Sequence, residues 1–344
     1  MNNTFLYGLT VLIWGSTWFA VELQLGVVAP EVSLVYRYGA ASALLFAWSR
    51  FRSLQLRFAL REHGWFLLLG VLLFGLNYIV VYRAQIHITS ALTAIAFSSM
   101  VWMNIINARL FFGVKADKRV LIGALLGASG ILYLFAPQIS EISFNDTVFY
   151  GSFLTVLSAL IASFGNMVSQ ATQKAKLPVV QTNAWGMFYG AVFTGVIATV
   201  NGHSFDFEWT AGYIGSLAYL TVFGSIVAFG AYLTLLGRIG AHKAGYAMVM
   251  FPVVALVVST LFEGLQIDTT TVIGTLLVLA GNLFVLNTRR YLNAGPDTQD
   301  TIDFRLPDVT GLTRCVRKEG NTIRDPISLG AGCKLSANRN SPPS

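Results

Sequence analysis

Arg37 is the most constrained candidate for chemistry in this chain, because it lies inside an apolar run, 33–49, nearly long enough to cross a lipid bilayer. A cation at that depth usually faces a protein interior, a partner or a water-filled cavity. Its guanidinium could hold the carboxylate of a bound molecule. The alternatives are a structural ion pair with Glu22 or Glu31, or a side chain that extends to the polar surface.

Two tryptophans occur earlier, in the apolar run 5–23. Trp14 and Trp18 are one helical turn apart and therefore share a face. Tryptophan is common where a membrane meets water, but Trp14 is near the middle of its run. The pair could form an aromatic wall that attracts an ammonium group by cation–π contact, or it could only pack against neighbouring helices.

The run 90–112 places polar and large side chains along one helical stripe: Thr93, Phe97, Met100, Asn104 and Asn107, with Ser98 and Trp102 nearby. Polar groups are costly in hydrocarbon unless they are paired, so the stripe should face protein or water. Part of it could line a passage. The alternative is hydrogen bonding between helices, which contributes only about 0.6 kcal/mol per bond.

A proline interrupts the later run 243–262, which also offers Tyr246 and Met250. Pro252 frees a backbone carbonyl and permits a bend, which could serve gating or be a static kink. Weaker candidates of the same kind are Asn77 and Tyr78 in the run 64–82 and Asn166 in the run 148–170.

Other kinds of chemistry find little support. The four histidines are scattered in or near the polar turns: His63, His87, His203 and His242. The sequence has no HExxH, no phosphate-binding P-loop and no G-x-S-x-G motif, and both cysteines, Cys315 and Cys333, lie near the C-terminus. We therefore expect no metal and no other cofactor. Carboxylates at membrane depth are few, so a buried proton relay is poorly supported.

The elements that carry these residues are predicted to be ten membrane-spanning helices. Hydrophobic residues make up 55% of the chain and charged residues only 11%, against about 25% charged in a soluble domain. The apolar runs are 5–23, 33–49, 64–82, 90–112, 120–135, 148–170, 181–200, 212–236, 243–262 and 271–286.

Charge placement predicts the orientation of these helices. With the N-terminus in the cytoplasm, the inward segments carry thirteen basic residues and the outward loops carry Arg83 alone, a strong positive-inside pattern. Both termini are then cytoplasmic, and the net charge of +7 reflects topology rather than nucleic-acid binding. The inward set is Arg50, Arg52, Arg57, Arg61, Lys115, Lys118, Arg119, Lys174, Lys176, Arg238, Lys243, Arg289 and Arg290.

The chain also contains an internal repeat. Residues 88–135 align without a gap on residues 239–286, with twelve of 48 pairs identical. Each copy holds five spans, an odd number, so the second copy must enter the membrane from the opposite side, as in many secondary transporters. The predicted organisation is a first five-helix repeat at 1–136, an outward loop at 137–147, a second repeat at 148–288, and a disordered cytoplasmic tail at 289–344.

Glycines spaced four residues apart predict close helix contacts. Gly123-x-x-x-Gly127 and Gly186-x-x-x-Gly190 allow two backbones to approach. In a bundle of this size we expect mostly contacts within one chain. A homodimer is the alternative to a monomer.

Several segments together resemble the EamA-type drug/metabolite transporters: Trp14-Gly15-Ser16-Thr17-Trp18, Arg37, and the repeated Leu110-Phe111-Phe112-Gly113 and Leu261-Phe262-Glu263-Gly264. The resemblance covers about residues 5–288. It implies a ten-helix inner-membrane carrier, and many members of the family export amino acids and other small metabolites. The family usually has a proline in the fourth span and a glutamate before its last glycine. Pro252 and Glu263 keep this pattern, whereas Val101 and Phe112 depart from it.

The sequence thus favours an exporter of amino acids or related compounds that works by alternating access between the two halves, with a small metabolite and the bilayer as its partners. An exchanger of phosphorylated or nucleotide-linked metabolites is the first alternative, but it would require several basic residues in the cavity. A membrane-embedded enzyme is less favoured, because it would require acidic residues or histidines clustered at one face.

Overall fold

The computed structural model describes residues 1–88, 90–134, 147–262 and 269–286. The tail 289–344, most of the loop 137–147 and Glu263 lie outside the described residues. Residues 1–134, the N-terminal half, form α1 (Asn3–Glu22), α2 (Pro30–Phe51), α3 (Leu60–Leu69), η1 (Gly70–Leu76), α4 (Asn77–Gln85), α5 (Ser90–Phe97), α6 (Met100–Phe112) and α7 (Lys118–Leu134). Residues 147–286, the C-terminal half, form α9 (Thr147–Lys174), α10 (Val179–Val200), α11 (Ala211–Tyr219), η2 (Leu220–Val227), α12 (Ala228–Ile239), α13 (Ala241–Ala244), η3 (Gly245–Met250), α14 (Phe251–Phe262) and α15 (Thr269–Leu286).

Each predicted span overlaps one of these helices or a consecutive series of them. Within the described ranges, five segments are long and apolar enough to cross a membrane: Asn3–Glu22, Leu60–Gln85, Thr147–Lys174, Val179–Val200 and Ala211–Ile239. Large apolar side chains such as Leu12, Phe153 and Val196 are exposed on them, which suits a lipid-facing surface. The chain is an all-α membrane protein, and the count of ten crossings stays a prediction.

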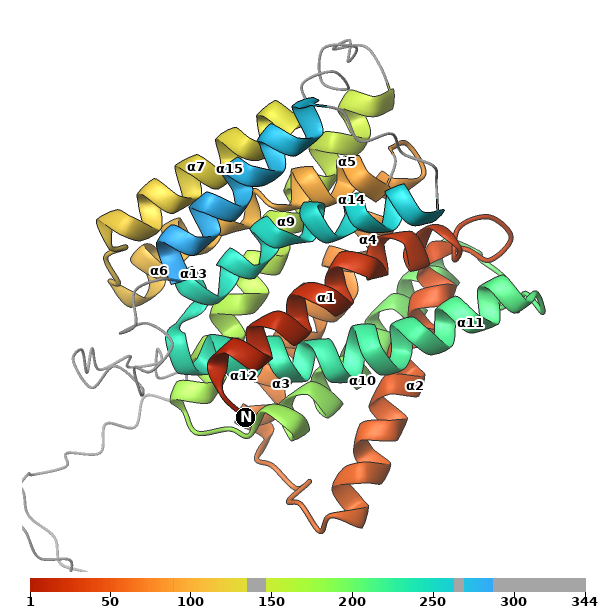
Figure 1. The fold of residues 1–344 in the computed structure, drawn as a ribbon. Coiled ribbons are helices and arrows are strands. Elements are labelled where there is room, and N and C mark those ends of the chain that lie inside the picture. The colour runs from red at the N-terminus through yellow and green to blue at the C-terminus, as the bar shows by residue number, and fades with distance from the viewer. Residues whose placement is uncertain (89, 135–146, 263–268, 287–344) are drawn as a thin grey trace, which may run out of the picture. The chain divides into compact units, whose positions relative to one another are not determined.

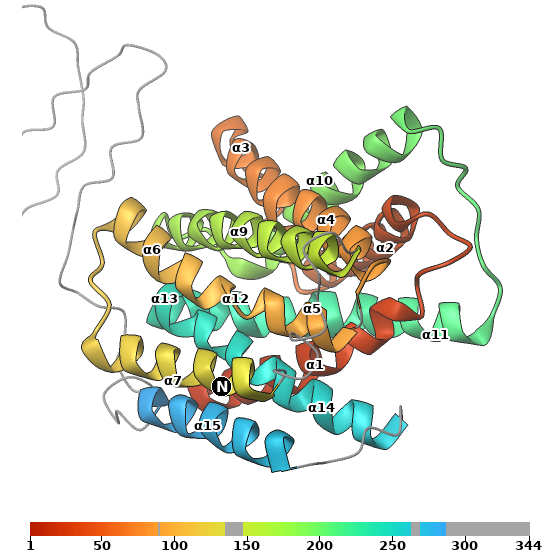
Figure 2. The same ribbon diagram turned by 90° about the horizontal axis from the view of Figure 1, so that it is seen from above.

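The last helices of the two halves, α7 and α15, form an antiparallel pair (Figures 1 and 2). A Cβ atom at Gly130 would lie 2.7 Å from the backbone nitrogen of Val278, and one at Gly281 would lie 2.8 Å from that of Gly127. The end of each helix therefore packs on the start or middle of the other. Only glycine permits this approach of two backbones.

Helices α2 and α10, the second helix of each half, also pack in opposite directions. Val35 near the start of α2 faces Gly195 near the end of α10, whereas Ser42 farther along α2 donates to the carbonyl of Ala184 at 2.9 Å. Equivalent helices that run antiparallel require halves of opposite orientation, so the predicted inverted repeat is confirmed.

The first helix of each half packs against helices of the other half. Helix α1 packs against α12 and α14, just as its equivalent α9 packs against α4 and α6. In Figure 1, α1 runs between α12 and α14. The predicted glycine motifs are used within the chain, because Gly186 and Gly190 pack on Gly70 and Phe74. The two halves interlock rather than stand side by side.

Irregular turns recur at equivalent positions. The π-helical turns η1 and η2 begin at Gly70 and Leu220, close to the 151-residue spacing of the repeat. Between α5 and α6, Ser98 and Ser99 break the helix, and the equivalent part of the C-terminal half is the 3₁₀ turn η3. The single continuous helix predicted over 90–112 is therefore wrong. Such irregular turns often mark functional sites.

The backbone conformation at the end of α6 explains the glycine of the segment Leu110-Phe111-Phe112-Gly113. Gly113 ends α6 with φ of 67°, a left-handed conformation in which a side chain would be strained. Its amide donates to the carbonyl of Arg109 at 3.0 Å. This cap positions the sharp turn into α7.

Candidate functional site

A cavity of about 50 Å³ lies where the two halves meet. The N-terminal half contributes walls from α1, α2, η1, α4 and both sides of the α5–α6 break, and the C-terminal half contributes α9, α12, η3 and α14. This volume suits a few water molecules, which need roughly 10–15 Å³ each. A molecule of metabolite size would require the walls to move apart.

Eight of the residues singled out from the sequence line this cavity: Trp14, Trp18, Arg37, Asn77, Tyr78, Phe97, Met100 and Asn166. They come from six different helices. The structure therefore brings together the charged, aromatic and amide groups that the sequence singled out. Their role in transport stays a prediction.

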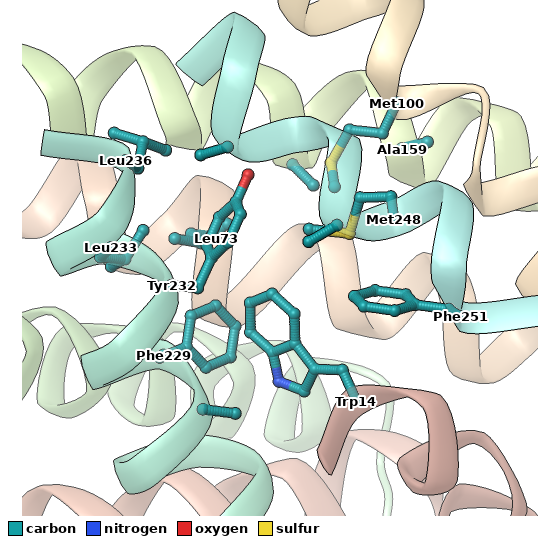
Figure 3. Packing of buried hydrophobic residues seen from close by; sticks show 14 of the residues in the cluster. Trp14, Leu73, Met100, Ala159, Phe229, Tyr232, Leu233, Leu236, Met248 and Phe251 are labelled. Carbon is teal, nitrogen blue, oxygen red and sulfur yellow. The ribbon is translucent and has the colours of Figure 1, made fainter. Parts of the chain in front are cut away.

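Trp14 occupies the centre of an aromatic cluster, which Figure 3 shows from close by. Its ring centroid lies 4.7 Å from that of Phe229, 5.0 Å from that of Tyr232 and 5.8 Å from that of Phe251. The indole N–H donates to the carbonyl of Gly224 at 2.9 Å. This bond holds the indole ring in its orientation within the aromatic wall.

Arg37 is almost fully buried, with 1% of its surface exposed. Its Nε donates to Ser225 Oγ at 2.9 Å and its Nη1 donates to the Tyr82 hydroxyl at 3.3 Å. The guanidinium also lies over the rings of Tyr38 and Tyr78, at 5.1 and 4.8 Å from their centroids. Among the described residues, no carboxylate lies within 4.0 Å of it.

Among the described residues, Arg37 forms no ion pair with Glu22 or Glu31, the two partners that the sequence suggested. Glu31 instead accepts a hydrogen bond from Arg83 Nε at 3.1 Å, and its second oxygen lies 3.7 Å from His203. Burial also excludes an Arg37 side chain that extends to the surface. The cation is thus held by neutral groups inside the cavity wall.

The polar stripe of the fourth run lies partly behind the wall. Asn104 is fully buried and its Oδ1 accepts from Ser163 Oγ at 2.8 Å and from Asn166 Nδ2 at 3.3 Å. Asn107 Nδ2 donates to Ser163 at 2.9 Å. Asn104 and Asn107 therefore form hydrogen bonds between helices, which was the alternative to lining a passage. Through this network Asn104 also accepts a hydrogen bond from the lining residue Asn166.

The other predicted residues do not line the cavity. Thr93 is fully buried, and Ser98 and Trp102 are half-buried at or after the helix break. Tyr246 is buried in η3, where its carbonyl accepts from the Tyr7 hydroxyl at 3.3 Å. Met250 and Pro252 flank the start of α14.

Sequence reasoning missed part of the wall, chiefly Thr17, Leu73, Phe229, Tyr232, Met248 and Phe251. One signal could have found three of them, because adding the repeat spacing of 151 to Tyr78, Phe97 and Met100 gives Phe229, Met248 and Phe251. The remaining three are not equivalent to any residue that the sequence singled out.

Comparison with known proteins decides the family. The EamA-like transporter family matches residues 4–136 and again residues 149–287. The chain belongs to the EamA-like transporter family. It is thus a multi-pass membrane transporter, and the resemblance drawn from the sequence is confirmed.

Individual relatives agree with this assignment. The transporter is 24% identical to the uncharacterized transporter YoaV of Bacillus subtilis over 81% of this chain and 96% of that one. It is 27% identical to the uncharacterized inner membrane transporter YedA of Escherichia coli over 72% and 79% of the two chains. One solved crystal structure superposes with a TM-score of 0.69 at 16% identity, covering 85% of this chain and 99% of the other, which shows a shared fold.

Proposed function

We propose that this transporter exports amino acids or related carboxylate-bearing metabolites across the inner membrane by alternating access. The observation that carries the proposal is the cation of Arg37, which is buried in the cavity wall without a carboxylate among the described residues. A buried charge is costly unless it is paired. A carboxylate on the transported molecule supplies that partner.

The hydrogen-bond geometry supports an anionic ligand. Ser225 and Tyr82 occupy Nε and Nη1 of Arg37, and in the described part of the chain no acceptor is found for Nη2. Trp18, another lining residue, has a buried indole N–H with no partner among the residues that the structure describes. Unpaired donors are what an anion requires, and arginine binds carboxylates with good geometric specificity.

The arrangement of the halves supports alternating access. Residues on both sides of each helix break, such as Phe97 and Met100 in one half and Met248 and Phe251 in the other, line the cavity. Secondary carriers commonly form their sites from discontinuous helices at the interface of inverted repeats. Relative movement of the halves at these breaks would open the cavity to one side and then to the other.

The alternatives fit the cavity less well. Arg37 is the only charged residue among the described lining residues, whereas phosphorylated or nucleotide-linked substrates carry more charge than one arginine balances. A membrane-embedded enzyme would require reactive acid–base groups, and the other polar groups that line the described cavity are amides, hydroxyls and the indole N–H groups.

The proposal is tested by transport in proteoliposomes that contain the purified protein. Leucine and leucinamide differ in the carboxylate alone as a binding group for Arg37, so wild-type protein should move leucine and discriminate against the amide. In Arg37→Gln, leucine transport should fall about 10- to 100-fold, the range expected for a charged hydrogen bond, while leucinamide transport changes little.

Arg109→Gln is the matched control. Arg109 is exposed near the end of α6 and lies outside the cavity, so removing its charge should leave both rates unchanged. Equal transport of leucine and leucinamide by wild-type protein, or an equal loss of both in Arg37→Gln, would contradict the proposal. So would rates no higher than those of protein-free vesicles for every amino acid.

A further inference from the structure

In the described part of the chain, the cavity wall also holds an unpaired acceptor, on α9. Asn166 lines the cavity with 1% of its surface exposed, and its Oδ1 has no hydrogen-bond partner among the described residues. Its Nδ2, in contrast, is used fully, since it lies 3.1 Å from the Tyr232 hydroxyl and 3.3 Å from Asn104 Oδ1. The free atom is thus an acceptor.

The network behind Asn166 sets the direction of its amide. Asn107 donates to Ser163, and the Ser163 hydroxyl donates in turn to Asn104 Oδ1. Because Asn104 Oδ1 is an acceptor, the atom of Asn166 that faces it must be a donor, so Asn166 turns its Nδ2 toward Asn104. Its Oδ1 is consequently left for a donor supplied from the cavity.

This acceptor is well separated from the guanidinium of Arg37. Arg37 bonds Ser225 in η2, whereas Asn166 bonds Tyr232 in α12, seven residues farther along the same continuous helical segment. Seven residues correspond to roughly 10 Å along a helix. A carboxylate at Arg37 and a donor at Asn166 therefore belong to groups several bonds apart on one ligand.

The wall between these two positions is aromatic. The ring of Trp14 contacts those of Phe229 and Tyr232. The ring of Tyr78 lies under the Arg37 guanidinium, and its centroid is 6.3 Å from that of Phe229. An apolar stem packs well against such rings. Near Asn166, whose Nδ2 lies 3.1 Å from the Tyr232 hydroxyl, the aromatic rings of Trp14 and Tyr232 border the cavity, and aromatic rings attract a cation more than a neutral donor.

From this arrangement we propose that the cavity selects elongated amino acids with a distal ammonium group. The carboxylate binds Arg37, the methylene stem packs along Trp14 and Phe229, and the distal ammonium donates to Asn166 Oδ1. The proposal rests on the proposed function and deepens it, because it names the substrate class within the carboxylates. A side chain that ends in a methyl group would leave the Asn166 acceptor unpaired.

Ornithine and norleucine test this directly, since they match in length and differ in an ammonium in place of a terminal methyl. Competition for transport in proteoliposomes should favour ornithine about tenfold, as expected for a charge-assisted hydrogen bond. In Asn166→Leu this ratio should fall to one or below, and in Asn166→Asp it should rise. Because the readout is a ratio, it does not depend on how much variant protein folds.

Asn77→Leu is the matched control. Asn77 is also a lining amide, but its Oδ1 already accepts from Ser158 at 2.6 Å, so its loss should leave the ratio unchanged. Ligand-induced thermal stabilisation of detergent-solubilised protein provides a second readout, with a larger shift for ornithine than for norleucine.

The outcomes separate the two proposals. If both compounds move in an Arg37-dependent way at equal rates, or if glutamate with its distal carboxylate is preferred, the distal-ammonium assignment is overturned and the carboxylate proposal stands. If neither compound moves nor stabilises the protein while leucine is transported in an Arg37-dependent way, the distal-ammonium assignment fails alone; if leucine is not transported either, both proposals fail.

Discussion

Arg37 and Trp185 stand at equivalent positions of the second helix in each half, 148 residues apart, yet their surroundings differ completely. Arg37 lies in the cavity wall among tyrosines. Trp185 is half-buried outside the cavity, where its ring packs against His63 at 4.5 Å and its N–H donates to the carbonyl of Leu56 at 3.3 Å. One position is polar and interior, and the other belongs to an aromatic cluster near the α2–α3 connection.

Inversion explains why this difference is possible. Helices α2 and α10 cross in opposite directions, so residues at the same place in each helix lie on opposite sides of the crossing point. Duplication therefore supplied two copies of a scaffold but only one position from which this side chain reaches the cavity. The packing is close to symmetric, whereas the charged group among the described lining residues, Arg37, belongs to the N-terminal half.

Side-selective labelling gives the largest expected difference between the halves, because the result is all or none. Cys315 and Cys333 are first replaced by serine, and single cysteines are then placed at Gln55, after α2, and at Ser204, after α10. Both positions are exposed and differ by about the repeat spacing. A membrane-impermeant maleimide should label Ser204→Cys in intact cells and Gln55→Cys only after permeabilisation, as the positive-inside pattern predicts.

A third cysteine at Lys176, in the exposed turn between α9 and α10, serves as the control for the inward side and should behave like Gln55→Cys. Labelling of Gln55→Cys and Ser204→Cys from the same side would contradict the inversion itself. Labelling with both sides exchanged would contradict only the predicted orientation.

Substitution of the paired glycines in α7 and α15 tests the symmetric part of the molecule. Gly130→Ala and Gly281→Ala each place a Cβ less than 3.0 Å from the backbone of the other helix, so each should destabilise the protein by about 1–3 kcal/mol. Because the two sites are equivalent, the decreases in Tm should be similar. Their combination should cost less than the sum, since separating the helices once relieves both contacts.

Gly230→Ala is the control for this pair, because a Cβ there meets no atom of the described residues within 4 Å. It should keep or slightly raise the Tm, since alanine favours helix by up to about 1 kcal/mol. A large effect at Gly130 with none at Gly281 would show that the two halves do not pack equivalently. Thermal unfolding followed in detergent measures all four variants.

Much of this fold could be read from the sequence, because apolar length and charge placement report directly on a membrane environment. The antiparallel pairs followed from an odd number of spans in each repeat. The breaks could not be read, since Ser98 and Ser99 in one half and η3 in the other look like ordinary helix sequence. A broken helix changes the register, which is why Phe97 and Met100 line the cavity while Asn104 lies behind it.

The site was predictable where a residue is costly at its depth, as with Arg37. It was not predictable where an ordinary residue matters through its partners. Asn166 became informative only once the network through Asn104 and Ser163 showed which of its amide atoms is free. Hydrogen-bond direction of this kind is a property of the assembled structure and has no counterpart in residue spacing.

The smallest effect is expected at the fourth helix, where the halves differ by a proline. Pro252 is the second residue of α14, and Val101, its equivalent by the repeat spacing, is the second residue of α6. In the first turn of a helix proline loses no α-helical hydrogen bond. Val101→Pro would lose only the bond from its amide to the carbonyl of Ser98 at 3.1 Å, so we expect a cost of about 1 kcal/mol.

Pro252→Val should likewise change leucine transport by no more than about threefold, because the start of α14 is set by the 3₁₀ turn before it rather than by the proline. Ile106→Pro is the contrasting variant: it is exposed in the interior of α6, where proline costs about 3 kcal/mol or more. If Pro252→Val instead abolished transport while Tm stayed unchanged, the proline would be a moving part of the gate. The two halves would then differ in mechanics as well as in chemistry.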